Sequence, residues 1–151
     1  MRVAARRGSI VENVTLAGCS ILVIEEQPFV ARCLQILLGD AGAEVHCTTC
    51  AGEALDVIDR RDFSAALLDC SQSAKGRRRV VQRLVRLGLP FMFCKEIDQD
   101  EAWPGVPVLI KPVIGIQLVD VLSRLIQAKN EKLAISKPSS VRMSQPAARR
   151  I

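Results

Sequence analysis

Five charged residues of this sequence stand at the ends of short apolar runs. They are Glu25, Glu26, Asp69, Lys95 and Lys111. If the apolar runs are parallel strands, their carboxyl ends lie along one edge of a sheet, which is where such folds bind ligands. Three carboxylates and two ammonium groups would then meet at one place. Because a hydrophobic core requires no charges there, we interpret the group as a candidate functional site.

These residue types favour phosphoryl transfer to a carboxylate. Clustered carboxylates repel one another unless a cation lies among them, and Mg²⁺ is the natural candidate because this hard ion binds carboxylates, waters and phosphate oxygens. Beside such an ion, one carboxylate can attack a phosphoryl group and form an acyl phosphate. A lysine opposite would neutralise the charge of the transferred group.

The elements that must position these residues follow from the apolar patterns. Apolar runs predict strands at residues 20–24, 64–68, 90–94 and 106–110, and residues 43–47 predict a further short strand. Helical spacing predicts helices at residues 29–41, 51–60, 77–87 and 114–128. The polar stretch between the last two strands has room for a turn or two of helix, so we expect a shortened fourth helix there.

Alternating strands and helices predict an α/β fold with a doubly wound, five-stranded parallel sheet and right-handed crossovers. We expect one domain over residues 20–128, an N-terminal extension over 1–19 and a disordered basic tail over 129–151. The excess positive charge belongs to the ends, because residues 20–127 carry a net charge of −2. The tail lacks the periodicity of a DNA-binding module, so we expect no nucleic-acid partner.

Composition excludes several other classes. No apolar run approaches the roughly 18 residues of a membrane span, so we expect a cytoplasmic protein. Six cysteines without a secretion signal indicate reduced thiols. Cys47 and Cys50 have CxxC spacing, but His46 is the only histidine and completes no zinc site. Since no histidine base is placed at a strand end, we also expect no independent enzyme activity.

Four segments, taken in order, resemble the receiver domain of two-component response regulators. They are ILVIEEQPFVARCLQILLGDAGAEV, AALLDC, PFMFC and PVLIKP. The resemblance covers about residues 19–127 and implies a flavodoxin-like fold. It also implies a histidine kinase or phosphotransfer protein as phosphate donor, a downstream protein as target, and a possible homodimer.

The resemblance assigns roles to individual residues. It implies that Asp69 accepts the phosphoryl group and that Lys111 contacts it. It implies that Glu25, Glu26 and Asp69 bind Mg²⁺ together with the backbone carbonyl of Ser71.

Three positions depart from the family pattern. Glu26 replaces the usual Asp and is one methylene longer, which displaces its carboxylate from a metal that tolerates little distortion. Lys95 replaces the switch Thr or Ser, and it is either a solvated lysine, a group that takes the phosphate electrostatically, or a partner of Asp69. Val108 replaces the aromatic switch residue. These departures keep open a second hypothesis, a pseudo-receiver that acts as a phosphate-independent protein-binding module.

A basic run, Arg77-Arg78-Arg79, opens the third predicted helix. The helix dipole disfavours cations at that end. The run is either a solvated basic turn or a contact to an acidic partner or a phosphate near Asp69.

Overall fold

The computed structural model describes residues 14–71, 73–97 and 103–137, in which five strands alternate with four helices. The elements are β1 (Ser20–Ile24), α1 (Pro28–Asp40), β2 (Glu44–Thr48), α2 (Ala51–Arg60), β3 (Ala65–Asp69), α3 (Ala74–Leu87), β4 (Phe91–Lys95), β5 (Val108–Ile110) and α4 (Gly115–Ser136). The predicted alternation is confirmed as far as β4, and no described helix separates β4 from β5.

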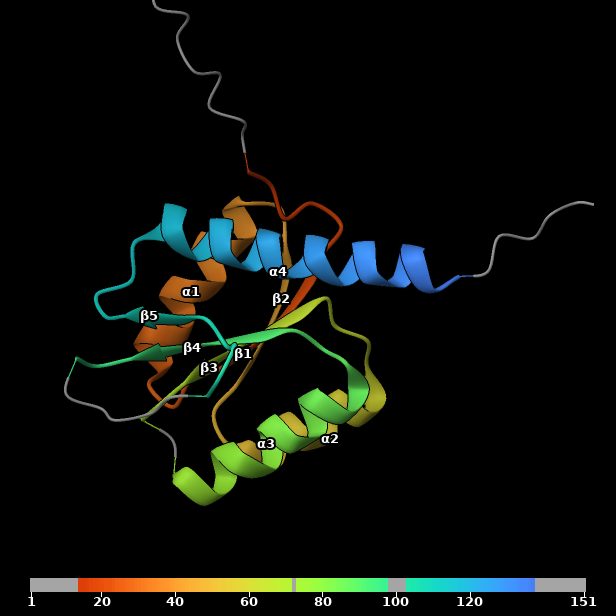
Figure 1. Ribbon diagram of the computed structural model, residues 1–151. Helices are drawn as coiled ribbons and strands as arrows, with labels where there is room; N and C mark the ends of the chain where they lie inside the picture. Colours follow the sequence, from red (N-terminus) through yellow and green to blue (C-terminus); the bar gives the residue numbers. More distant parts are fainter. Residues whose placement is uncertain (1–13, 72, 98–102, 138–151) are drawn as a thin grey trace, which may run out of the picture.

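The strands form one parallel sheet in the order β2-β1-β3-β4-β5. Helices α1 and α4 cover one face, and α2 and α3 cover the other (Figure 1). This arrangement confirms the doubly wound, flavodoxin-like sheet expected from the sequence. Its strand order reverses at β1 and β3, and the carboxyl ends of strands at such a reversal are where these folds bind ligands.

Strand β3 is buried throughout, and β1 nearly so, because helices cover both faces of the sheet. Successive side chains therefore alternate between two apolar clusters. Leu22 and Ile24 pack toward α2 and α3, whereas Ile21 and Val23 pack toward α1 and α4. The two central strands are thus clamped from both sides, which fixes the position of the residues at their ends.

Helix α3 begins three residues earlier than the sequence indicated. Ser73 caps it, since its hydroxyl accepts a hydrogen bond from the backbone N–H of Gly76 at 3.2 Å. This side chain satisfies one of the N–H groups that a helix start leaves unpaired. At the other end Gly88, with φ of 63°, closes the helix in the left-handed conformation that favours glycine.

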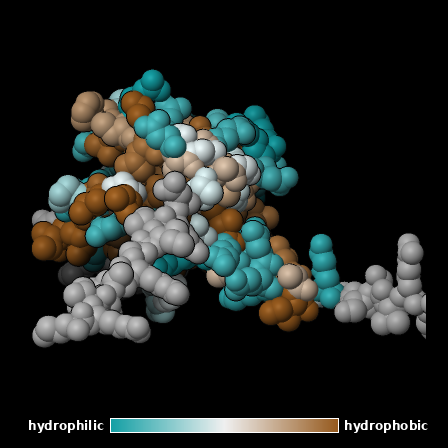
Figure 2. Space-filling view, turned by 90° about the horizontal axis from the view of Figure 1, so that it is seen from above, coloured by the Kyte–Doolittle hydropathy of each residue, from teal (hydrophilic) through white to brown (hydrophobic). Residues whose placement is uncertain are grey.

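Helix α4 continues to Ser136, so the prediction of a disordered tail from residue 129 is wrong for residues 129–136. This segment contains neither glycine nor proline, and Gln127 donates a hydrogen bond to Glu131 one turn later. Lys137 precedes Pro138, which disfavours further helix. Figure 2 shows this end of α4 projecting from the body of the molecule. The rest of the predicted tail lies outside the described residues.

The N-terminal extension is also shorter than predicted, because residues 14–19 belong to the fold. Leu16 is fully buried in the cluster beneath α1 and α4. Its backbone N–H donates to the carbonyl of Ala41 at 2.8 Å. A single buried leucine in a polar stretch leaves no periodic pattern, which is why the sequence did not reveal it. Residues 1–13 lie outside the described part.

The connection from β4 to β5 contains no helix within its described residues, 96–97 and 103–107. The expected helix remnant falls partly on residues 98–102, which lie outside the described part. Strand β5 begins two residues later than predicted, since Pro107 has no N–H to donate to a neighbouring strand. Among the described residues, no helix is long and apolar enough to cross a membrane.

Replacing Leu16 tests whether its segment is part of the core. We expect Leu16→Ala to lower the free energy of unfolding by roughly 2–5 kcal/mol, as for other buried leucines. Val14, which is 42% exposed, supplies the control, and Val14→Ala should change stability by less than about 0.5 kcal/mol. Chemical denaturation measures both, and equal effects would contradict the assignment.

Candidate functional site

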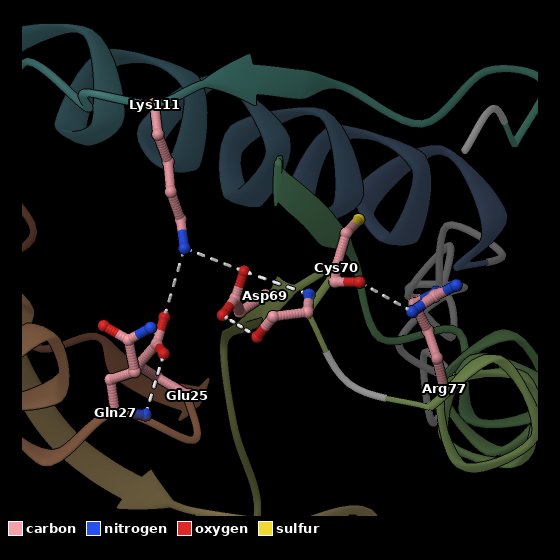
Figure 3. Close-up of polar contacts among 7 residues, drawn as sticks. Glu25, Gln27, Asp69, Cys70, Arg77 and Lys111 are labelled. Carbon is pink, nitrogen blue, oxygen red and sulfur yellow. Dashed lines mark hydrogen bonds and ion pairs between the residues drawn. The ribbon is translucent and has the colours of Figure 1, made fainter. Parts of the chain in front are cut away.

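The carboxyl ends of three strands bring Glu25, Asp69 and Lys111 together. Glu25 follows β1, Asp69 ends β3, and Lys111 follows β5. The Nζ atom of Lys111 lies 2.9 Å from Asp69 Oδ1 and 3.7 Å from Glu25 Oε2. Figure 3 shows this ammonium group reaching toward both carboxylates. The sequence analysis predicted that charged residues at the carboxyl ends of parallel strands would meet, and these three do.

Glu25 is a buried carboxyl group, with 1% of its surface exposed. Its Oε1 accepts a hydrogen bond from the backbone N–H of Gln27 at 3.0 Å. Burial raises the pKa of Glu25, and the neighbouring Asp69 raises it further, against the opposing effects of Gln27 and Lys111. Glu25 therefore holds a proton more readily than an ordinary glutamate does.

Asp69 is nearly as buried, at 3% exposed, but its surroundings favour the ionised form. Burial alone would raise the pKa of Asp69, yet hydrogen bonds from Ser71 and Lys111 outweigh burial and lower that pKa. The Ser71 hydroxyl donates to Oδ2 at 2.5 Å, and the Ser71 N–H donates to Oδ1 at 3.3 Å. Asp69 is thus held as a charged, oriented carboxylate.

Lys111 is fixed by both its backbone and its side chain. Its N–H donates to the carbonyl of Lys95 at 2.9 Å, and the peptide bond to Pro112 is cis. Burial lowers the pKa of Lys111, but the hydrogen bond to Asp69 outweighs this effect and raises it. The ammonium group therefore stays charged beside the two carboxylates.

The structure does not bring Glu26 into this cluster. Glu26 is exposed in the bend after β1, whereas Glu25 is buried. Accordingly, the described residues contain no group of three His, Cys, Asp or Glu side chains that could hold a metal ion. Glu25 and Asp69 still offer two converging carboxylates, and proteins commonly hold Mg²⁺ through one or two carboxylates plus waters. This donor set fits Mg²⁺ without Glu26.

The two predicted switch positions lie on neighbouring strands, at the end of β4 and at the start of β5. Lys95 ends β4, where it is half-buried and pairs with Ile110 of β5. Val108 packs against the cluster beneath α2 and α3, as does Trp103, for which no role was predicted from the sequence. The rings of Trp103 and Phe93 lie 6.5 Å apart. The roles of Lys95 and Val108 stay predictions.

Arg77 is the residue near the site that sequence reasoning placed least well. It is 5% exposed, and its Nη1 donates to the carbonyl of Cys70, next to Asp69, at 3.0 Å. Arg78 and Arg79 are exposed, as in a solvated turn. The solvated-turn interpretation is therefore wrong for Arg77, which instead ties α3 to the end of β3 (Figure 3). In sequence, Arg77 stands three and four residues before Val80 and Val81, which is the spacing of the buried face of α3.

The raised pKa of Glu25 predicts a pH-dependent stability. A group whose pKa is higher in the folded state favours folding while protonated, and its ionisation at rising pH removes stability. We expect Glu25→Gln to match the native protein below pH 4.5, the ordinary value for Glu, and to be the more stable of the two at pH 7. Denaturation across this pH range measures the difference.

Glu53 supplies a control of opposite sign. Hydrogen bonds from the Thr49 backbone N–H and hydroxyl lower its pKa, so its contribution is lost as the pH falls. Glu53→Gln should therefore be less stable than the native protein at pH 7 and equal to it in acid. Parallel pH profiles for the two variants would contradict the assignment at Glu25.

Comparisons with known proteins place this geometry in a fold family. No family model and no curated protein matches the sequence. Among solved structures, a response regulator receiver protein from Sinorhizobium medicae aligns with a TM-score of 0.62 and 18% identity, over 76% of this chain and 99% of that one. A receiver protein from Burkholderia phymatum aligns with a TM-score of 0.65 and 19% identity, over 72% and 95%.

A sensor protein from Polaromonas sp. is similar at 24% identity, with a TM-score of 0.64, over 74% of this chain and 98% of that chain. Identities at this level establish a shared fold. Over most of its length, the chain has the fold of the response-regulator receiver domains.

Proposed function

We propose that this chain is a phosphoacceptor receiver domain of a two-component pathway, phosphorylated on Asp69 by a histidine kinase or phosphotransfer protein. One observation carries the proposal. A buried, ionised Asp69 ends the central strand β3 and accepts a hydrogen bond from the Lys111 ammonium at 2.9 Å, within a receiver fold. A structural ion pair would not need to lie at the strand edge where these sheets bind ligands.

The residues divide the chemistry between them. An Asp69 oxygen attacks the phosphorus of a phosphohistidine, the P–N bond breaks, and an acyl phosphate forms while the electron pair returns to the imidazole. Lys111 stabilises the negative charge of the transferred group, because a fixed ammonium in a partly buried site is little screened by water. The hydrogen bonds from Ser71 orient the attacking carboxylate.

Glu25 and Asp69 would hold Mg²⁺ in this proposal. When bound, the ion supplies charge neutralisation for the phosphoryl oxygens. Glu25 has a further task, because its carboxyl group loses its proton more readily as positive charge arrives. The backbone carbonyl of Ser71 stays a predicted ligand, and Glu26 would have to turn inward from its exposed position to become one.

A second candidate function is a pseudo-receiver that binds a protein partner without phosphorylation. The exposed position of Glu26, away from Glu25 and Asp69, favours it. Lys95 and Val108, which replace both halves of the usual switch, favour it as well. In this case Lys111 is a permanent structural partner of Asp69 and Glu25.

Phosphorylation is tested by mass spectrometry of the intact protein after incubation with acetyl phosphate. We expect a gain of one phosphoryl group when Mg²⁺ is present and none when it is absent, because the buried site cannot accept more negative charge unaided. Asp69→Asn should abolish the gain. Asp56→Asn, which alters an exposed aspartate on α2, should not. Labelling that survives in Asp69→Asn would contradict the proposed acceptor.

A Mg²⁺ titration distinguishes the roles of the two acidic residues after β1, Glu25 and Glu26. In a Mg²⁺ titration followed by NMR, we expect Glu25→Gln to weaken binding at least tenfold, since it removes one of two converging carboxylates. Glu26→Gln should change the affinity less than about twofold, because an exposed charge contributes little. No binding to the native protein, together with no phosphoryl gain, would favour the pseudo-receiver.

A further inference from the structure

A cavity of about 250 Å³ lies beside the site, between α1, the inner strands and the loop after β5. Its walls are mainly apolar. Val23 and Leu67 contribute from the sheet, Leu34 from α1, and Val113 from the loop. Cys33, an exposed residue of α1, also lines it, so the cavity borders the molecular surface along that helix. An enclosure of this kind favours a compact apolar group.

The same cavity has a charged end, which is formed by Glu25, Asp69 and Lys111. Two carboxylates and one ammonium leave this end with an excess of negative charge when both acids are ionised. Asp69 Oδ1 lies within hydrogen-bond distance of Lys111 Nζ, whereas Glu25 Oε2 lies 3.7 Å from it, beyond that distance. Glu25 therefore accepts a closer donor without breaking a hydrogen bond to Lys111.

We propose that this cavity binds a small organic cation, a primary amine on a compact apolar body. The ammonium group donates to Glu25 and balances the excess charge, and the apolar body fills the space between α1 and the sheet. Benzene binds in an engineered apolar cavity of about 150 Å³, so a single ring fits the volume available here. Pockets that combine apolar walls with a few converging polar groups are typical small-molecule sites.

Occupancy would also affect phosphorylation, and this consequence rests on the proposed function. An amine at Glu25 lies beside the Asp69 carboxylate and competes for the space and charge that an incoming phosphoryl group requires. The cavity would then make phosphorylation of Asp69 sensitive to a small metabolite.

The probe is benzylamine, titrated into the unphosphorylated, Mg²⁺-free protein near pH 7 and followed by ¹H–¹⁵N NMR. We expect saturable shifts at the amides of Val23, Leu34 and Val113, which line the cavity. Benzyl alcohol, which has the same shape without the charge, should bind at least tenfold more weakly. Equal affinity for the two probes would overturn the assignment to amines, and no saturable shift would overturn the site itself.

Two matched variants of α1 locate the binding. Cys33→Phe places a ring into the cavity from an exposed position and should weaken benzylamine binding at least tenfold without disturbing the core. Ile36→Phe adds a ring on the same helix at a position that is 50% exposed and does not line the cavity, and it should bind as the native protein does. Unchanged binding in Cys33→Phe would show that benzylamine binds elsewhere and would overturn the proposal.

The regulatory consequence has its own measurement. Saturating benzylamine should slow acetyl phosphate labelling of the native protein at least several-fold, and an unchanged rate would overturn this consequence. A native protein that is never labelled overturns the proposed function instead, while the titration, which needs no phosphorylation, still decides on the cavity.

Discussion

Two carboxyl groups that are almost completely removed from water make one lysine indispensable. Glu25 and Asp69 are 1% and 3% exposed, and a buried charge without a partner is strongly destabilising. Lys111 supplies the partner for both. To do so, β5 must pair with β4, and the Lys111 N–H, which donates to the Lys95 carbonyl, extends that pairing to the site. The order of the strands is thus required for Lys111 to reach both carboxyl groups.

The two carboxyl groups respond oppositely to similar burial because their partners differ. Asp69 accepts hydrogen bonds from an ammonium, a hydroxyl and a backbone N–H, so its charge is stabilised. Glu25 has one backbone donor and a more distant ammonium, so burial prevails. Asp69 is therefore ionised and able to act as a nucleophile. Glu25 is a carboxyl group whose ionised form a nearby cation would stabilise. Both the proposed Mg²⁺ and the proposed amine use this difference.

The strands and the meeting of charges at their ends were predictable from the sequence. Parallel strands with both faces covered are continuously apolar, and their carboxyl ends lie along one edge of the sheet. That reasoning placed Asp69 and Lys111 together. It did not distinguish Glu26 from Glu25, because the bend after β1 leaves Glu26 exposed while Glu25 is buried. It also failed for Leu16, whose burial comes from tertiary contacts, and for Arg77, a charged residue that shares the buried face of α3 with Val80 and Val81. The end of α4 was missed because its last turns are polar, although their helix propensity is good.

Helix α4 starts four residues after Lys111 and runs 22 residues to Ser136, which at 1.5 Å per residue is about 33 Å. Its first half packs on the sheet, and its second half extends beyond the body. A rotation of α4 about its first turn, near the charged site, would therefore move its C-terminal end the most. A tilt of about 5° at the Lys111 end would carry the far end through about 3 Å by the same geometry. A displacement too small to disturb the core would thus be amplified at the surface farthest from Asp69.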